Sequence, residues 1–233
     1  MRKVLGFITQ TFRRFNFPWG YVNSSFSQEG EDLILARIFG EKEKGFYVDV
    51  GAHHPIRFSN TYLFYRKGWS GLNIDAMPGS MKSFEKIRGR DINIETAVSN
   101  RKSCLNFHIF NEPALNTFSK DLAKDYMQTG YTLVDTQEII TRPLSTILRE
   151  SLPTGTHIDF MSIDVEGEDM NVLMSNDWNK FRPDYLLVEI LGVSSLQSLM
   201  ESSEYKLLSS YGYDFFAKSV NTVFFKNKSC DSL

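Results

Sequence analysis

Short apolar runs that alternate with helix-like stretches are the feature that most restricts the fold of this 233-residue chain. Four of these runs carry apolar residues on both faces, as strands at the centre of a parallel sheet do: FYVDV, GLNID, DFMSID and YLLVEI. Segments with helical periodicity, opened by Pro or ended by Gly, separate several of them. Strands and helices in this alternating order predict a right-handed α/β layer.

The same patterns predict the remaining elements. Helices are expected over residues 29–39, 55–67, 80–88, 169–174 and 195–211. Further strands are expected over INIETAVS, over residues 106–110 and in a β-hairpin over residues 213–226. Ser27 is expected to be the N-cap of the first helix. Residues 111–141 are polar and irregular, so the segment at about 105–142 is expected to be an insertion over the active-site end of the sheet.

Composition limits the class of protein. With 42% hydrophobic and 23% charged residues, the chain resembles an ordinary globular protein of one domain. The net charge of −2 gives no long-range attraction to nucleic acid. Cys104 and Cys230 form neither a disulfide framework nor a metal pair, which is typical of a reduced, cytoplasmic protein. No apolar run approaches the roughly 20 residues that span a bilayer.

Residues 1–26 form a basic and aromatic segment ahead of the main domain. If residues 1–22 are helical, Val4, Ile8 and Phe12 share one face, with basic side chains around it. This face is expected to contact its own domain, a partner protein or an anionic membrane surface, which would make the protein membrane-peripheral. A cleaved signal peptide is disfavoured because polar residues interrupt the apolar stretch and no small-residue cleavage site follows.

The turn after the first strand, in FYVDVGAHHP, indicates the ligand. Gly51 permits a sharp turn and a close approach to a ligand, but the further glycines that a pyrophosphate needs are missing. Asp75 ends the second strand, where an acidic side chain can accept hydrogen bonds from both ribose hydroxyls. A ribose without a pyrophosphate points to S-adenosylmethionine, with its amino-acid end at Gly51 and Asp49 near its amino group or sulfonium.

The chain resembles the FkbM family of S-adenosylmethionine-dependent methyltransferases in SQEGEDLIL, VDVGAHHPIRFSNTYLFYRKGWSGLNIDAMPGS, TAVSN and SIDVEGEDMNVL. The resemblance covers residues 27–190, and SIDVEG followed by an acidic residue is its most specific part. It implies a Rossmann-like class I methyltransferase fold over residues 27–233, with a seven-stranded, mostly parallel sheet and an antiparallel C-terminal hairpin. It also implies O-methylation, with sugar or glycoconjugate hydroxyls among the usual acceptors. Many members have Asn or Ser where this chain has His53 and His54.

Three carboxylates are candidates for the chemistry. Asp164 and Glu166 lie at the end of the fourth expected strand and Glu189 ends the fifth, so all three are expected near the methyl group. Glu166 is the expected general base or hydroxyl anchor, and Asp164 is expected to contact the cofactor or a metal ion. His54 is an alternative base. The four groups could also bind a divalent cation such as Mg²⁺. In the alternative, in which these residues have only structural roles, Asp164 would cap a helix, Glu166 would be solvated and the histidines would only hydrogen-bond the turn.

Other polar or small residues are expected around the cofactor. They are Gln28 and Asp32 before the first strand, His53, Asn60 and Thr61 after it, and Ala97, Val98 and Ser99 at the end of the third. Helix-capping and helix-surface roles explain Gln28, Asp32, Asn60 and Thr61 equally well. The polar groups of residues 116–119, in the insertion, are expected to face the acceptor.

Two other functions fit parts of the pattern. A nicotinamide-dependent oxidoreductase would share the Rossmann-like sheet, but it would need glycines where residues 53–56 read HHPI. A catalytically inactive scaffold could keep the fold and bind the cofactor without turnover. The joint presence of Asp49, Gly51, Asp75, Asp164 and Glu166 favours the enzyme.

Overall fold

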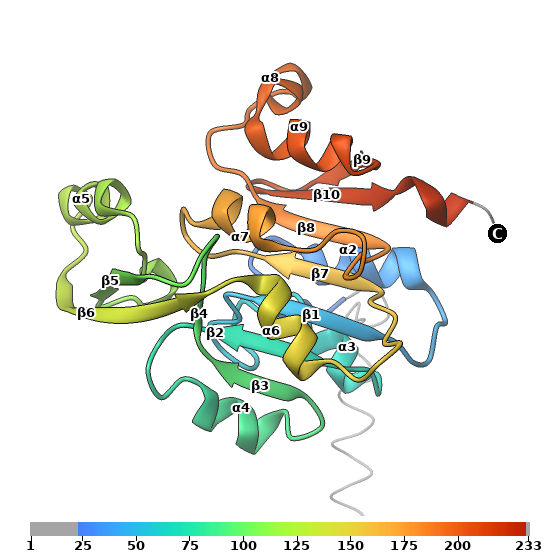
Figure 1. Cartoon of the computed structure of the whole chain (residues 1–233), viewed down its shortest axis with the longest axis horizontal. Coiled ribbons are helices and arrows are strands. Elements are labelled where there is room, and N and C mark those ends of the chain that lie inside the picture. The colour runs from blue at the N-terminus through green and yellow to red at the C-terminus, as the bar shows by residue number, and fades with distance from the viewer. Residues whose placement is uncertain (1–22, 232–233) are drawn as a thin grey trace, which may run out of the picture.

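Seven strands form the central sheet of the computed structural model, which describes residues 23–231 (Figure 1). The strands are β1 (Phe46–Val50), β2 (Ser70–Asp75), β3 (Ile92–Glu95), β7 (Phe160–Ile163), β8 (Tyr185–Glu189), β9 (Tyr213–Lys218) and β10 (Thr222–Asn227). Their order is β3-β2-β1-β7-β8-β10-β9, and only β10 runs antiparallel to its neighbours, β8 and β9. The predicted mostly parallel sheet with a C-terminal hairpin is therefore confirmed.

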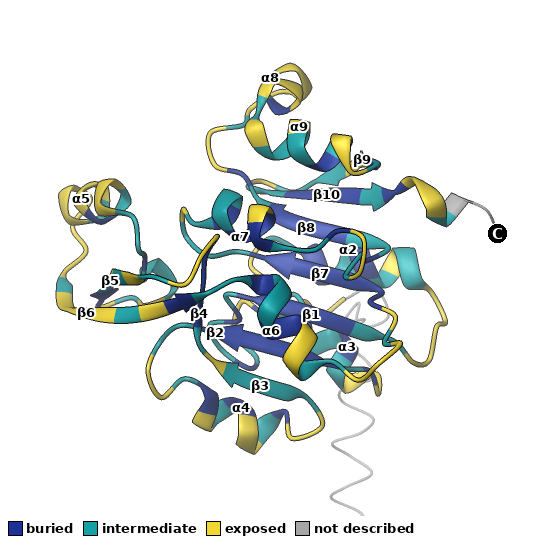
Figure 2. Ribbon diagram, in the orientation of Figure 1, coloured by how far each residue is buried: buried dark blue, intermediate teal, exposed yellow. Residues whose placement is uncertain are grey.

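Side chains alternate between two hydrophobic cores on the two faces of this sheet. On β1, Val48 and Val50 enter one core and Tyr47 enters the other, and all three are buried. The first face is covered by α6 (Leu144–Ser151), α7 (Asp169–Ser175) and α9 (Ser203–Ser210), and the second by α2 (Glu31–Phe39) and α3 (Tyr62–Arg66). Figure 2 shows the central strands buried along most of their length. Burial on both faces explains why their sequences are almost continuously apolar.

The strand order reverses between β1 and β7. From β1 the chain adds β2 and β3 on one side, and from β7 it adds β8 on the other. In the parallel register of these two strands, Val50 lies opposite Ile163, so both strands end at the same level. The turns that follow, at Gly51 and Asp164, therefore meet at the point where open α/β sheets bind their ligands.

The segment after β3 forms an ordered unit of its own. Its elements are β4 (Ala97–Val98), β5 (Cys104–Phe110), the 3₁₀ helix η2 (Pro113–Leu115), α5 (Lys120–Gln128) and β6 (Leu133–Arg142). They form a three-stranded sheet, β4-β6-β5, and Figure 1 shows β5, β6 and α5 beyond the carboxyl ends of the parallel strands. The expectation that residues 111–141 are irregular is wrong. Most of β6 is exposed, so its sequence lacks the apolar alternation that would identify a strand.

Several predicted boundaries differ because of local backbone conformation. The helix expected over residues 55–67 begins only at Tyr62, since Phe58 has φ 56, a left-handed conformation that a right-handed helix excludes. The helix expected over residues 195–211 is divided at Ser202 into α8 (Leu196–Glu201) and α9. Ser202 is extended there, and its hydroxyl accepts the N–H of Tyr205 as the cap of α9.

Three further differences concern single elements. The strand expected over INIETAVS is interrupted at Thr96, so its two halves join different sheets. The first helix has Gly30 at its N-cap, with φ 88, whereas the Ser27 hydroxyl hydrogen-bonds Asp32 inside the helix. Helix α6 was not expected, although it buries Leu144 and Ile147. The expected helices over residues 80–88 and 169–174 correspond to α4 (Met81–Ile87) and α7.

Among residues 23–231, no helix combines the length and the hydrophobicity needed to cross a lipid bilayer. The membrane contact expected for residues 1–22 lies outside the described part of the chain.

Candidate active site

A cleft of about 1100 Å³, which includes space open to solvent, lies at the carboxyl ends of β1, β2, β7 and β8. The predicted site residues among its walls are Gln28, Gly51, His53, Asn60, Asp75, Val98, Asp164, Glu166 and Glu189. Asp49, His54 and Ala97 are not among them. The structure therefore brings residues from four strand ends together at the place where the strand order reverses.

Gly51 holds the turn at the centre of the cleft. Its φ is 82, and a Cβ built on it would lie 1.7 Å from the carbonyl oxygen of Asp164. The backbone N–H groups of Gly51 and Ala52 both donate to the carbonyl of Ile74, at 2.9 and 3.0 Å. The turn is thus wedged between the ends of β2 and β7, and only glycine fits both its conformation and its space.

Asp75 is held in place by the backbone before any ligand arrives. One carboxylate oxygen accepts the N–H of His53 and the other accepts the N–H of Met77, each at 2.8 Å. Burial raises the pKa of Asp75, and the two backbone donors oppose that shift. The carboxylate therefore faces the cleft in one fixed orientation with lone pairs left for a ligand.

Asp49 lies beneath the turn rather than in the cleft wall. It is buried, and its Oδ2 accepts a hydrogen bond from the Thr61 hydroxyl at 2.7 Å. Burial raises the pKa of Asp49 to about 6, and the Thr61 bond and the charge of Arg88 act against that rise. Asp49 and Thr61 thus anchor the turn from below, and neither lines the cleft as the sequence suggested.

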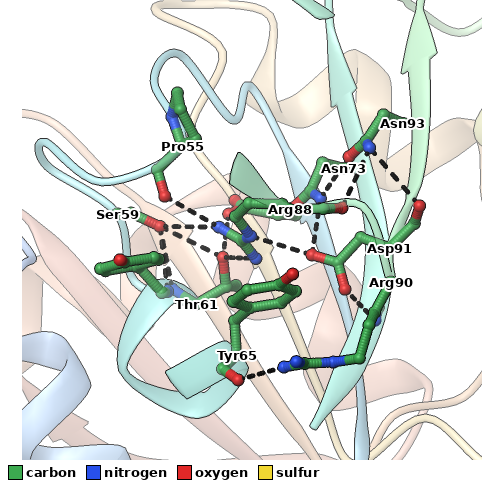
Figure 3. Close-up of polar contacts among 12 residues, drawn as sticks. Pro55, Ser59, Thr61, Tyr65, Asn73, Arg88, Arg90, Asp91 and Asn93 are labelled. Carbon is green, nitrogen blue, oxygen red and sulfur yellow. Dashed lines mark hydrogen bonds and ion pairs between the residues drawn. The ribbon is translucent and has the colours of Figure 1, made fainter. Parts of the chain in front are cut away.

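A buried arginine ties the loop after the turn to the sheet (Figure 3). Arg88 forms an ion pair with Asp91 at 2.9 Å, and both side chains are fully buried. Arg88 also donates to the hydroxyls of Tyr47 and Thr61, at 2.7 and 2.9 Å, and to the carbonyl of Pro55. The sequence offered no signal for this network, because KIRGRD reads like the exposed end of a helix.

The two histidines differ in position. His53 lines the cleft with φ 51, its ring stacked beside Phe58 at 6.3 Å between centroids. Burial, with the Arg57 charge, lowers the pKa of His53 to about 4, so the ring is neutral at neutral pH. His54 instead uses Nδ1 to accept the N–H groups of Ile56 and Arg57, at 3.1 and 2.9 Å. The structure thus places His54 as a cap of the local turn and not in the cleft as a base.

Asp164, Glu166 and Glu189 converge on one side of the cleft. Each offers a carboxylate oxygen, and these oxygens lie within 4.8 Å of one another. Burial and the other carboxylates raise the pKa of Glu166 to about 7 and that of Glu189 to about 10. Oε2 of Glu189 is buried and has no hydrogen-bond partner in the described part of the chain. Three such groups cannot all carry a charge at neutral pH.

Glu166 lies in a turn beyond the end of β7 and not on an extension of the strand. Strand β7 ends at Ile163, and Glu166 lies in a tight turn with φ 50. Asp169 holds this turn, because its carboxylate accepts the N–H groups of Val165 and Gly167 at 3.1 and 3.2 Å. Asp169, which sequence reasoning missed, therefore fixes the turn that carries Glu166.

The remaining predicted contacts are distributed around the cleft. Asn60 lines it and donates from Nδ2 to the Ser162 hydroxyl at 3.0 Å. Val98 lines it, whereas Ala97 is fully buried. Asp32 is also buried and accepts hydrogen bonds from the segment that precedes α2, so it orders that segment and does not reach the cleft.

The insertion supplies one wall of the cleft. Its lining residues are Phe107, Pro113, Ala114, Asn116 and Phe118. Asn116 accepts the N–H of Phe110 at 2.9 Å, and its amide nitrogen faces the sulfur of Met77 at 3.7 Å. The aromatic residues Phe58, Phe107 and Phe118 were not expected in the site, because nothing in their sequence context separates them from core residues.

Comparison with models of protein families identifies one family. A model of the methyltransferase FkbM domain matches residues 49–215. No curated protein matches the sequence significantly. Among solved structures, a TehB-like SAM-dependent methyltransferase from Corynebacterium glutamicum is 9% identical, with 94% of this chain and 97% of that chain covered and a TM-score of 0.43. Precorrin-6y C5,15-methyltransferase from Geobacter metallireducens is 10% identical, with 83% and 84% covered and a TM-score of 0.40. Because the domain match spans well over half of its length, the chain belongs to the FkbM family of S-adenosylmethionine-dependent methyltransferases.

Proposed function

We propose that this methyltransferase transfers the methyl group of S-adenosylmethionine to a hydroxyl of a neutral sugar or glycoconjugate. The observation that carries the proposal is the position of Asp164, Glu166 and Glu189, which share a cleft with Gly51 and Asp75. One side of the cleft suits an adenosyl cofactor and the other offers a base for a hydroxyl.

The cofactor side of the cleft is proposed from groups that the backbone holds in place. Asp75 would accept hydrogen bonds from the ribose hydroxyls, and the Gly51 turn would let the amino-acid end approach the backbone. Gln28 and Asn60 lie in the same wall as polar groups for that end, and Met77 and Val98 offer apolar contact for an adenine. His53 and Phe58 stand where a dinucleotide fold would need open space for a pyrophosphate, which disfavours a nicotinamide cofactor.

The pKa values of Glu166 and Glu189 support their proposed roles on the acceptor side of the cleft. When bound, S-adenosylmethionine supplies an electrophilic methyl group on a sulfonium. Glu166, with a pKa of about 7, would take the hydroxyl proton as the oxygen–carbon bond forms and the sulfur–carbon bond breaks. Glu189, whose pKa is about 10, keeps its proton and can donate a hydrogen bond to the acceptor. Alignment of the two reactants between these groups would supply the larger part of the rate.

The charge of the cleft indicates the acceptor class. Among the described residues that line it there are several carboxylates and no Lys or Arg. Phosphorylated or nucleotide-linked sugars would therefore meet repulsion without a cationic partner. Carboxylates that accept hydrogen bonds, together with the lining side chains of Phe58 and Phe118, instead suit the hydroxyls and apolar parts of a neutral sugar.

A screen with labelled cofactor tests this proposal. We expect methyl transfer to neutral sugars or glycans and none to their phosphorylated counterparts, and the reverse preference would contradict the acceptor class. Thermal stabilisation by S-adenosylmethionine but not by NAD separates the enzyme from an oxidoreductase. Cofactor binding without turnover on any acceptor would support the inactive scaffold.

A requirement for a divalent cation and a membrane contact are two further proposals that can be tested. The three carboxylates offer the oxygen ligands that Mg²⁺ takes, and activity before and after dialysis against EDTA tests whether the reaction needs a divalent cation. The membrane contact of residues 1–22 is proposed from the sequence alone. Sedimentation with anionic liposomes, for the full chain and for a chain without these residues, tests it.

A further inference from the structure

The inserted unit contacts the turn that carries Glu166 at three points. The Thr117 hydroxyl donates to the backbone carbonyl of Glu166, and the Tyr126 hydroxyl donates to Oε2 of its side chain at 2.6 Å. The third contact is at Gly167, where an added Cβ would lie 2.9 Å from Leu122 Cδ1. Helix α5 is thus closely packed on the turn and not merely near it.

We infer that Tyr126 is a positioning residue that holds Glu166 in the orientation needed to meet the acceptor hydroxyl. This inference rests on the proposed role of Glu166. Tyr126 occupies Oε2, and no other hydrogen bond to the Glu166 side chain comes from the described residues, so Oε1 is the oxygen left for the acceptor. Glu166 has φ 50, a conformation that residues with a side chain adopt only when their surroundings hold them.

The ring of Tyr126 is itself fixed. It packs edge-to-face against Phe110, with centroids 5.7 Å apart, and against Tyr131 at 6.4 Å. Most residues of α5 are exposed, whereas Leu122, Ala123 and Tyr126 form its inner face. Burial and the bond to Glu166 raise the pKa of Tyr126, so its hydroxyl remains a donor at every working pH. A rigid donor on a closely packed helix can set the direction of a carboxylate.

The test separates positioning from simple packing. Tyr126→Phe keeps the ring contacts and removes only the hydroxyl. We expect kcat to fall about 10-fold, with the Kd for S-adenosylmethionine and the melting temperature unchanged. Tyr131→Phe is the matched control, because its partly exposed ring touches Tyr126 but no bond joins it to Glu166, and it should leave kcat unchanged.

A double variant decides the outcome. If Tyr126 acts through Glu166, adding Tyr126→Phe to Glu166→Gln should cause no further loss of kcat, whereas independent effects would multiply. Multiplied losses, or a Tyr126→Phe enzyme with normal kcat beside an impaired Glu166→Gln enzyme, would overturn this inference alone. Full turnover by Glu166→Gln would overturn the assigned base and this inference with it.

Discussion

The turn after β1 and the turn after β7 lie side by side at the cleft, yet different parts of the chain hold them. Gly51 is fixed by the sheet, through backbone bonds to Ile74 and close contact with Asp164. Below it, Arg88 connects the following loop to the buried ends of the strands. The first turn therefore depends on the parts of the chain that build the fold itself.

The second turn is held by Asp169 of α7 and, in addition, by the inserted unit. Glu166 adopts φ 50 without the freedom of a glycine, and Thr117 and Tyr126 from the insertion hold it there. The comparison teaches that the proposed cofactor side is part of the core, whereas the proposed acceptor side depends in addition on a separate unit.

Gly51→Ala gives the largest expected effect and tests the first half of the comparison. The new Cβ would meet the Asp164 carbonyl at 1.7 Å, so we expect a loss of more than about 3 kcal/mol in the free energy of unfolding. Gly79→Ala is the control, because Gly79 has φ 83 but nothing within 4 Å of its added Cβ. It should lose only about 1 kcal/mol. Equal losses in urea unfolding would show that steric closeness to Asp164 does not matter.

Glu166→Gln tests the second half. We expect kcat to fall about 100-fold while the Kd for S-adenosylmethionine stays the same, because the amide cannot take the hydroxyl proton. Glu168→Gln is the control, since Glu168 hydrogen-bonds Ser99 and Asn171 outside the cleft and should leave kcat unchanged. A normal kcat for Glu166→Gln, measured where chemistry limits the rate, would remove the base from the acceptor side.

Asp75→Ala should produce the opposite pattern. Loss of the proposed ribose acceptor should weaken S-adenosylmethionine binding about 30-fold by titration calorimetry, with kcat at saturating cofactor much less affected. Asp75→Asn keeps one acceptor oxygen and should fall between Asp75→Ala and the natural protein. Unchanged affinity in Asp75→Ala would mean that the ribose does not lie at the end of β2.

The sequence predicted the sheet and most of the cleft because both follow from local rules. Buried strands are recognisable by continuous apolar residues, and residues at their carboxyl ends converge by topology. Asp75, Glu166 and Glu189 were therefore found by position alone. Asp49 and His54 do not line the cleft, because their side chains have partners beneath or beside the turn.

What the sequence could not predict depends on distant partners. Arg88 and Tyr126 look like ordinary helix residues, and only their contacts with Thr61 and Glu166 reveal a role. The strand expected over residues 106–110 corresponds to β5, but β6 is mostly exposed and polar, so no apolar alternation marked it. Left-handed residues such as Phe58 give no signal either, since glycine is the expected residue there.

Glu189→Gln tests how a buried carboxyl group on the acceptor side affects the stability of the protein at different pH values. Its folded pKa, about 10, lies above the ordinary value, so the folded state binds the proton more tightly than the unfolded state. The stability that this group contributes is complete at acidic pH and is lost as the pH rises toward 10. A glutamine stays neutral at every pH, so Glu189→Gln should be more stable than the natural protein, and the gain in the free energy of unfolding should be larger at pH 8 than at pH 5. Glu41→Gln, at an exposed site, should leave the stability unchanged at both pH values. Thermal melts of both variants at the two pH values measure the difference. An equal gain at pH 5 and pH 8 would show that the proton taken up by Glu189 on folding is not its cause.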